Sequence, residues 1–199
     1  MNPDQQRVPE PIVNIVGEKI ALGPFDRDWL PLYLRWANDF QVMRMFMPIL
    51  RPITAEARQE WYDRITKPES GTVDFTIYER ASMRAIGYTS LEEIDHRHRT
   101  ATYSLLIGEK DCWGKGYGTE TTRLMLEYAF TVLDLHNVFL SVNADNHPAI
   151  RVYTRAGFRE IGRRRDAHWV AGRTADEVFM DCLATEFQPP VPTPSPAAA

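Results

Sequence analysis

The feature that most constrains the fold of this chain is a short segment with glycine at every second position. Residues 111–120 read DCWGKGYGTE, with Gly114, Gly116 and Gly118 between a strand-like stretch and a helix-like stretch that begins at Thr119. Glycine at alternate positions suits neither a strand nor a helix, because it loses the most backbone freedom on folding. The segment is therefore predicted to be a loop, either a plain tight turn or a loop that wraps closely around a ligand.

A loop that leads from a strand into a helix is suited to binding an anion. The first N–H groups of a helix have no partners within the helix, and the helix dipole places partial positive charge there. Glycines let such a backbone approach an anion closely, as in phosphate-binding turns. The spacing matches neither the P-loop, with its Lys-Ser/Thr pair, nor the dinucleotide GxGxxG pattern. The position favours phosphate binding, and a glycine-rich turn without a ligand is the alternative.

The composition predicts one ordinary globular domain with tails. The chain has 199 residues, of which 44% are hydrophobic and 25% charged, and this matches a single soluble domain. We expect that domain at residues 12–187. Residues 1–11 are polar with prolines, and residues 188–199 are rich in Pro and Ala, so both ends are predicted to be disordered tails.

The charge and cysteine content exclude several classes of protein. The formal net charge of −4 argues against a general nucleic-acid binder, which would be basic. Cys112 and Cys182 lie far apart and form no CxxC pair, so neither a disulfide framework nor a metal site is expected and a cytoplasmic location fits. No apolar run approaches the roughly 18 residues of a membrane span, and no signal peptide is expected at the N-terminus.

The hydrophobic pattern predicts the element order β-α-α-β-β-β-α-β-α-β-β. Alternation of Val73, Phe75 and Ile77 is typical of a half-buried strand. Helical spacing appears in residues 26–40, 54–65, 119–135 and 147–158, with Thr54 as an N-cap candidate for the second of these helices. The charged residues 96–99 are predicted to be a hairpin turn. The order indicates a mixed α/β (α+β) fold, in which an antiparallel meander precedes a β-α-β crossover.

A second motif follows the strand after the long predicted helix. Residues 143–158 read NADNHPAIRVYTRAGF, with Tyr153 seven residues after Asn146 and on roughly the same helical face. A tyrosine hydroxyl at the end of a cleft can donate a proton to a leaving group. Taken alone, the motif favours a packing role for Tyr153, with its hydroxyl bonded to a neighbour.

Together the two motifs resemble the GNAT superfamily of acetyl-CoA-dependent N-acetyltransferases. Residues 107–120 resemble its pyrophosphate loop, and residues 146–158 its Asn-x-x-Ala-x-x-x-Tyr-x-x-x-Gly-Phe segment. The superfamily often has Arg or Gln where this chain has Trp113, but Trp is usual in the branch that contains ribosomal-protein alanine acetyltransferases and spermidine acetyltransferases. The likeness covers residues 12–187. Within it, the stretches that resemble this branch are 36–46, 85–95, 126–142 and 165–187.

The resemblance implies a largely antiparallel sheet flanked by helices, with a splayed pair of central strands that holds the pantetheine arm of CoA. It places the backbone of Leu105, Leu106 and Ile107 against that arm, where an N–H group would also stabilise the oxyanion. Asn143 and Asn146 become candidates for hydrogen bonds to it. Lys115 would add charge to the pyrophosphate loop, with a solvated lysine as the alternative. The implied pyrophosphate-binding residues are Trp113, Gly114, Lys115, Gly116, Tyr117, Gly118 and Thr119.

The resemblance also implies direct attack of a neutral amine on acetyl-CoA in a ternary complex. Tyr153 would protonate the CoA thiolate. The base is less defined: Glu92 and Glu93 are neighbours on one predicted strand and should point to opposite faces, so at most one faces the cleft. Glu92 is the candidate base. A solvent-facing strand edge is the favoured alternative for either glutamate, and Ser104 or Tyr103 could instead pass the proton through water.

The acceptor is the least constrained part of the prediction. In this family the first two helices, their connection and the closing hairpin build its site, which points to Met43, Phe46 and Trp169, with core packing as the alternative. A small amine, an antibiotic or a peptide N-terminus fits, with the protein a monomer or homodimer that binds neither nucleic acid nor membranes. The alternative function is a CoA-binding sensor or partner module without catalysis, while the missing Lys-Ser/Thr pair argues against an ATP-binding protein.

Overall fold

The computed structural model of this chain describes residues 11–44, 46, 50–67, 70–170 and 172–189. The predicted tails at 1–11 and 188–199 lie outside these residues except for residues 11, 188 and 189, and their disorder stays a prediction. No helix among the described residues is both long and apolar enough to cross a bilayer.

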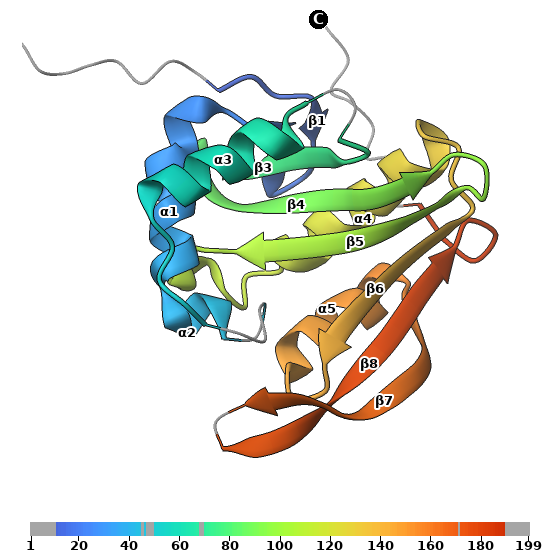
Figure 1. Ribbon diagram of the computed structural model, residues 1–199. Coiled ribbons are helices and arrows are strands. Elements are labelled where there is room, and N and C mark those ends of the chain that lie inside the picture. Colours follow the sequence, from blue (N-terminus) through green and yellow to red (C-terminus); the bar gives the residue numbers. More distant parts are fainter. Residues whose placement is uncertain (1–10, 45, 47–49, 68–69, 171, 190–199) are drawn as a thin grey trace, which may run out of the picture.

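Eight strands in the described part of the chain form one sheet, which Figure 1 shows as a strongly twisted layer. Their spatial order is β1-β2-β3-β4-β5-β6-β8-β7. The strands are β1 (Ile15–Val16), β2 (Ile20–Pro24), β3 (Val73–Glu79), β4 (Arg84–Asp95), β5 (Thr100–Ile107), β6 (Asn137–Asn143), β7 (Arg159–Val170) and β8 (Arg173–Leu183). Within this described sheet every neighbouring pair is antiparallel except β5 and β6, which confirms the predicted fold class.

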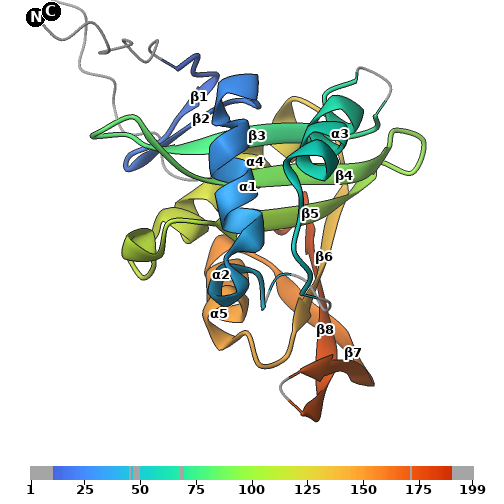
Figure 2. The same cartoon turned by 60° about the vertical axis from the view of Figure 1, so that its left-hand side comes forward.

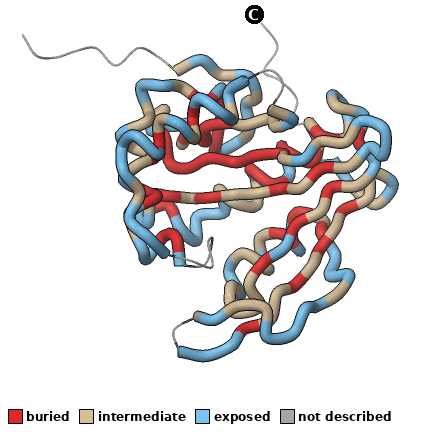
Figure 3. Tube along the Cα trace, viewed as in Figure 1, coloured by how far each residue is buried: buried red, intermediate tan, exposed pale blue. Residues whose placement is uncertain are grey.

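Helices cover both faces of the sheet (Figures 1 and 2). The α-helices are α1 (Leu30–Asn38), α2 (Phe40–Met43), α3 (Ala55–Ile65), α4 (Tyr117–Thr131) and α5 (His147–Ala156), and the 3-10 turns are η1 (Arg27–Trp29) and η2 (Lys110–Cys112). On one face, α1 and α3 bury an aromatic core around Tyr33 and Trp36. On the other face, α4 and α5 bury a larger, mainly aliphatic core around Leu126 and Val138. Strand β4 lies between the two cores and is buried along much of its length (Figure 3).

Helix boundaries follow the capping chemistry of the sequence. Thr54 caps α3 as predicted, and its hydroxyl accepts a hydrogen bond from the Ala57 N–H at 3.2 Å. Asp26 caps η1, and α1 begins after this turn, at Leu30. Helix α2 was not predicted, and it begins because the Asp39 carboxylate accepts hydrogen bonds from the N–H groups of Gln41 and Val42. Helix α4 begins two residues before the predicted Thr119.

The parallel pair β5–β6 is joined over a short length only. Its register covers Thr100 with Asn137, Ala101 with Val138, and Thr102 with Phe139. Beyond Thr102 both strands continue but no longer pair, as Figure 1 shows by the gap that widens between them. The predicted splay is therefore confirmed, and the backbone edge of β5 that would face β6 is unpaired with it from Tyr103 to Ile107. Aromatic packing occupies the point of divergence, since the Tyr103 ring stacks on Phe158 at 5.9 Å.

Candidate functional site

The three glycines at the start of α4 differ in their backbone conformation. Gly114 and Gly116 have φ angles of 75° and 88°, in the left-handed region that other residues adopt only with strain. Gly118 has no such φ angle, but a Cβ there would lie 3.4 Å from Leu105 and 3.5 Å from Val152. The first two glycines thus shape the turn, whereas the position of Gly118, between β5 and α5, would accommodate a Cβ at ordinary van der Waals distances.

The start of α4 presents free hydrogen-bond donors. Gly116 is the N-cap and offers no side chain to the helix. Within the described part of the chain, the N–H groups of Tyr117, Gly118 and Thr119 have no hydrogen-bond acceptor. Unsatisfied N–H groups at a helix N-terminus, beside a left-handed glycine turn, fit the negative charge of a pyrophosphate. The exposed Lys115 lies in the same loop.

Two side chains hold this loop against the sheet. The Tyr117 hydroxyl donates to Glu79 at 2.6 Å, and this hydrogen bond to a carboxylate raises the pKa of Tyr117 to about 12. The Trp113 indole N–H donates to the backbone carbonyl of Ile107 at 2.9 Å. Trp113 therefore folds back onto the end of β5, where the strand has already parted from β6.

Tyr153 lies beside the splayed strands on the α5 side. Its ring is buried, 6.1 Å from the Tyr103 ring and 5.9 Å from that of Phe158. Burial raises the pKa of Tyr153 to about 12, which keeps the hydroxyl protonated at neutral pH. Among the described residues its hydroxyl has no hydrogen-bond partner, whereas the packing alternative predicted a bond to a neighbour. The ring is buried, but the unpaired hydroxyl oxygen is not sealed from solvent, so it is available to bond a ligand atom.

The two predicted asparagines build the turn between β6 and α5. Asn143 Oδ1 accepts from the Asp145 N–H at 2.8 Å, and Asn146 Oδ1 caps α5 by accepting from the Ala149 N–H at 3.3 Å. Both residues lie at the end of β6 that has diverged from β5. Their hydrogen bonds to a CoA arm stay a prediction, and their side-chain oxygens already have these local partners.

A pocket of about 270 Å³ lies on the other face of the sheet, against α3. Aromatic and apolar side chains form part of its wall, and two carboxylates on the sheet form another part. Its lining residues are Phe46, Trp61, Arg64, Ile65, Thr72, Asp74, Tyr88, Ser90 and Glu92. The pocket brings the predicted base Glu92 together with the predicted acceptor residue Phe46.

Both carboxylates in this pocket hold protons more tightly than usual. Burial raises the pKa of Glu92, and the negative charges of Asp74 and Glu93 add to the effect. Burial likewise raises the pKa of Asp74. Ser104 donates to Glu92 at 2.8 Å. Asp74 accepts from Ser90 at 2.5 Å and from Thr72 at 2.7 Å.

Sequence reasoning missed Asp74, although a signal existed. The alternation of Val73, Phe75 and Ile77 places Asp74 on the opposite face of β3, which reads as solvent-facing in an amphipathic strand. In the structure α1 and α3 cover that face and turn it into the wall of a pocket. Two predicted helices between the first strands and β3 were the available sign that both faces would be covered.

The prediction that Glu92 and Glu93 point to opposite faces is wrong. Between Glu92 and Asp95 the register of β4 against β5 shifts by one residue, and Glu93 adopts a φ of 52°. Thr102, on the same face of β5 as Ser104, donates to Glu93 at 3.1 Å. This β-bulge re-aims Glu93, so both carboxylates meet the same face of β5.

Of the predicted acceptor residues Met43, Phe46 and Trp169, only Phe46 lines this pocket. Its ring lies 6.3 Å from that of Tyr88. Met43 is buried in the aromatic core instead, as the packing alternative expected. Trp169, with 70% of its surface exposed, lies on β7 and is absent from this pocket's lining. Met45, Met47 and Ile49, apolar residues of the same connection between the first two predicted helices, lie outside the described residues.

No group of three or more His, Cys, Asp or Glu side chains that could hold a metal ion occurs in the part of the chain that the structure describes. The two cysteines there, Cys112 and Cys182, are both free and buried.

Comparisons with known proteins agree with this geometry. Residues 19–159 match the family described as Acetyltransferase (GNAT) domain. Spermidine N(1)-acetyltransferase of Vibrio cholerae is 32% identical over 56% of this chain, a match that spans 64% of that protein. The Escherichia coli K12 enzyme of the same name is 27% identical over 81% of this chain and 84% of its own length. A crystal structure of the Vibrio cholerae spermidine N-acetyltransferase with CoA and spermine superposes with a TM-score of 0.77, at 25% identity over 85% of this chain and 98% of that one.

The different backbone conformations of Gly116 and Gly118 predict different losses of stability when each is replaced by alanine. Gly116→Ala is expected to lower the free energy of unfolding by about 1–3 kcal/mol, because alanine is strained at a left-handed φ. Gly118→Ala is the matched control, since its Cβ would meet its neighbours at ordinary van der Waals distances. Urea denaturation measures both, and equal losses would contradict the assignment.

Proposed function

This chain belongs to the acetyltransferase (GNAT) family, and we propose from this premise that its acceptor is a small cationic amine bound in the pocket of Asp74 and Glu92. The enzyme is an acetyl-CoA-dependent N-acetyltransferase. The observation that carries the acceptor class is the pair of buried carboxylates within an aromatic wall. Two curated relatives are spermidine acetyltransferases by name, which supports an acceptor that resembles a polyamine.

The pocket has the chemistry that an alkyl ammonium group needs. Carboxylates that are already held by hydroxyl donors keep a fixed direction toward the pocket, and they attract a cation strongly where water is excluded. Phe46 and Ile65 offer apolar surface to a methylene chain. Arg58 lies 4.3 Å from the Trp61 ring centroid and so already occupies that ring. The Phe46 and Tyr88 rings line the pocket beside the two carboxylates.

The donor side of the site lies around the splay and the glycine loop. Acetyl-CoA supplies an activated acetyl thioester. We propose that the N–H groups at the start of α4, with Trp113, Gly114, Lys115 and Gly116, hold its pyrophosphate. The backbone edge of Leu105, Leu106 and Ile107 that has parted from β6 would pair with the pantetheine amides, apart from the Ile107 carbonyl, which already accepts from Trp113. Asn143 and Asn146 would contact the same arm from β6 and α5.

Glu92 and Tyr153 are proposed as general base and general acid. Ser104 and Tyr103 are adjacent on β5 and therefore point to opposite faces. Glu92 lies on the Ser104 side, and Tyr153 lies on the Tyr103 side. The amine would thus lose its proton on one face of the β5 edge, while the thiolate receives its proton from the other face, and both transfers are general acid–base steps of direct attack in a ternary complex.

A screen of amines tests the acceptor class. Thiol release that depends on acetyl-CoA should be fastest with diamines and polyamines such as spermidine, compared with aminoglycosides and peptide N-termini. Asp74→Asn should raise the acceptor KM roughly tenfold or more by removing a charged partner, with the acetyl-CoA KM unchanged. Asp63→Asn, at an exposed carboxylate of α3, is the matched control. A preference for peptides, or an unchanged acceptor KM in Asp74→Asn, would overturn the assignment.

Removal of the Tyr153 hydroxyl tests the general acid. Tyr153→Phe should lower kcat roughly 10²–10⁴-fold, because the thiolate would leave without a proton donor. The dissociation constant of acetyl-CoA, measured by calorimetry, should stay the same, since the ring still packs between Tyr103 and Phe158. Unchanged turnover would exclude the role.

The pH dependence of Glu92 tests the general base. A base must be ionised, so kcat should be full above the pKa of Glu92 and fall as the pH drops through it, at a pH above the ordinary value of 4.5. Glu92→Gln should lower kcat roughly 10²–10⁴-fold and remove this acidic limb.

The same substitution should leave the fold intact. A carboxyl with a raised pKa binds protons more tightly in the folded state, so its ionisation opposes folding as the pH rises. Glu92→Gln removes that opposition and should be at least as stable as the parent at pH 7 in urea denaturation. An unaltered limb of kcat in this variant would assign the limb to another group.

A further inference from the structure

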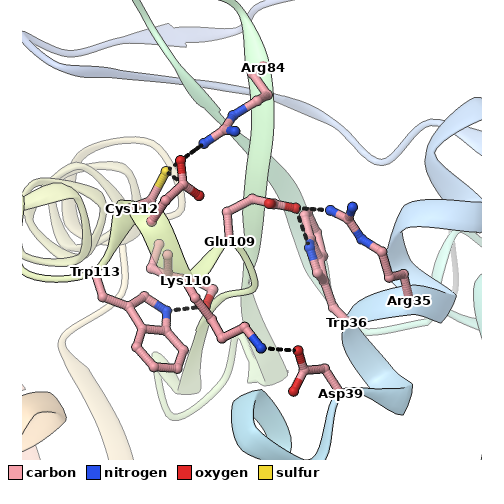
Figure 4. Close-up of polar contacts among 10 residues, drawn as sticks. Arg35, Trp36, Asp39, Arg84, Glu109, Lys110, Cys112 and Trp113 are labelled. Carbon is pink, nitrogen blue, oxygen red and sulfur yellow. Dashed lines mark hydrogen bonds and ion pairs between the residues drawn. The ribbon is translucent and has the colours of Figure 1, made fainter.

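The segment between β5 and the glycine loop is bound to the helices of the acceptor side (Figure 4). It comprises residues 109–113 and contains η2, which turns the chain from the end of β5 into Gly114. Two of its side chains, Glu109 and Lys110, reach α1 and the start of α2. Neither residue is explained by cofactor binding or by the chemistry proposed above.

Lys110 binds Asp39, the residue that caps α2. Its ammonium donates to Asp39 Oδ2 at 2.7 Å and to Gln41 Oε1 at 3.2 Å. The other carboxylate oxygen, Asp39 Oδ1, accepts from the N–H groups of Gln41 and Val42 and so starts α2. The same carboxylate thus joins Lys110 to the helix, and the hydrogen bond from Lys110 lowers the pKa of Asp39.

Helix α2 in turn carries the wall of the acceptor pocket. The N–H of Phe46 donates to the carbonyl of Met43, the last residue of α2, at 2.9 Å. Phe46 lines the pocket. A displacement of Lys110 therefore reaches Phe46 through Asp39 and a single helical turn.

Glu109 provides a second connection through the aromatic core. Its carboxylate accepts from the Trp36 indole N–H at 2.8 Å and also binds Arg35. The Trp36 ring is buried and lies 6.5 Å from the ring of Tyr88, another residue of the pocket wall. A Cβ on Gly108 would lie 2.3 Å from the Trp36 ring, so the backbone before Glu109 already touches this core.

The other end of the segment is fixed to the cofactor side. The Trp113 N–H donates to the Lys110 carbonyl at 3.2 Å, and the Trp113 indole is bonded to the end of β5. Asp111 forms an ion pair with Arg84 of β4 at 2.6 Å. A turn this short and this well bonded transmits a change at Trp113 and Gly114 to Lys110.

We infer that Glu109 and Lys110 are positioning residues that couple occupancy of the glycine loop to the acceptor wall of α2 and Phe46. The role of that wall rests on the proposed function. Binding at the loop would order the turn, hold Lys110 on Asp39 and so fix Phe46 beside the pocket. Because coupling between two binding sites is reciprocal, a bound acceptor would also tighten CoA binding.

Hydrogen exchange with CoA alone tests this coupling without any acceptor. In the parent protein, saturating CoA should slow exchange of the Val42, Met43 and Arg44 amides, roughly 5-fold or more, the lower range of allosteric coupling. Lys110→Met should remove most of that protection while it leaves the melting temperature nearly unchanged, because the Lys110 and Asp39 side chains are 45% and 30% exposed and such pairs contribute little to stability.

Matched variants separate the coupling from the helix cap. Asp39→Asn keeps a good N-cap but removes the charge that Lys110 binds, so it should also lose the protection, and the double variant should lose no more than either single one. Lys67→Met, at an exposed lysine after α3, should retain it. The inference is overturned if CoA binds, as shown by a shift in melting temperature, without protecting α2, or if Lys110→Met is protected like the parent. Failure of CoA to bind would instead overturn the donor site that the proposed function assigns.

Discussion

The rest of the structure depends on the interruption of backbone pairing between β5 and β6. A parallel pair needs a crossover connection, which α4 supplies, and in this sheet the pair separates after Thr102. An unpaired strand edge inside a protein leaves donors and acceptors that must find other partners. The divergence leaves a slot in which β5 offers the backbone groups that a neighbouring strand would otherwise pair with. Such a slot suits the amide groups in the arm of CoA. The glycine loop and the start of α4 lie where β5 ends, so one divergence sets both halves of the donor site.

The interrupted pair also explains why the two proposed catalytic groups come from different layers. Helices α1 and α3 bury the carboxylates of β3 and β4 on one face, and α5 brings a tyrosine to the other face. Burial raises the pKa of Asp74 and Glu92 on one face, and it likewise raises the pKa of Tyr153 on the other. A carboxyl is far more acidic than a phenol to begin with, so Glu92 is the proposed base and the protonated Tyr153 is the proposed acid. The edge of β5 separates the two groups.

Much of this arrangement could be predicted from the sequence, for physical reasons. Glycine at alternate positions before a helix, Thr54 at an N-cap and the alternation in β3 are local signals, and the structure follows each of them. The departures have non-local causes. Glu93 was assigned to the wrong face because a bulge depends on the pairing of two strands. Asp74 was overlooked because the strand pattern alone does not show that α3 packs over its face of the sheet. Helix α2 depends on Asp39, whose cap is reinforced by Lys110 from 71 residues away.

Ser104 and Tyr103 are neighbours on β5 and point to opposite faces, and this has a consequence for how protons enter and leave the site. Acetylation of a protonated amine releases one proton overall. If Glu92 takes protons on one face and Tyr153 gives one on the other, each turnover leaves excess protons on the Glu92 side and a missing proton on the Tyr153 side. The backbone of β5 lies between them and carries no titratable group. Each side must then re-equilibrate with solvent by its own route, so the resting enzyme is restored by two separate exchanges with water instead of one internal transfer.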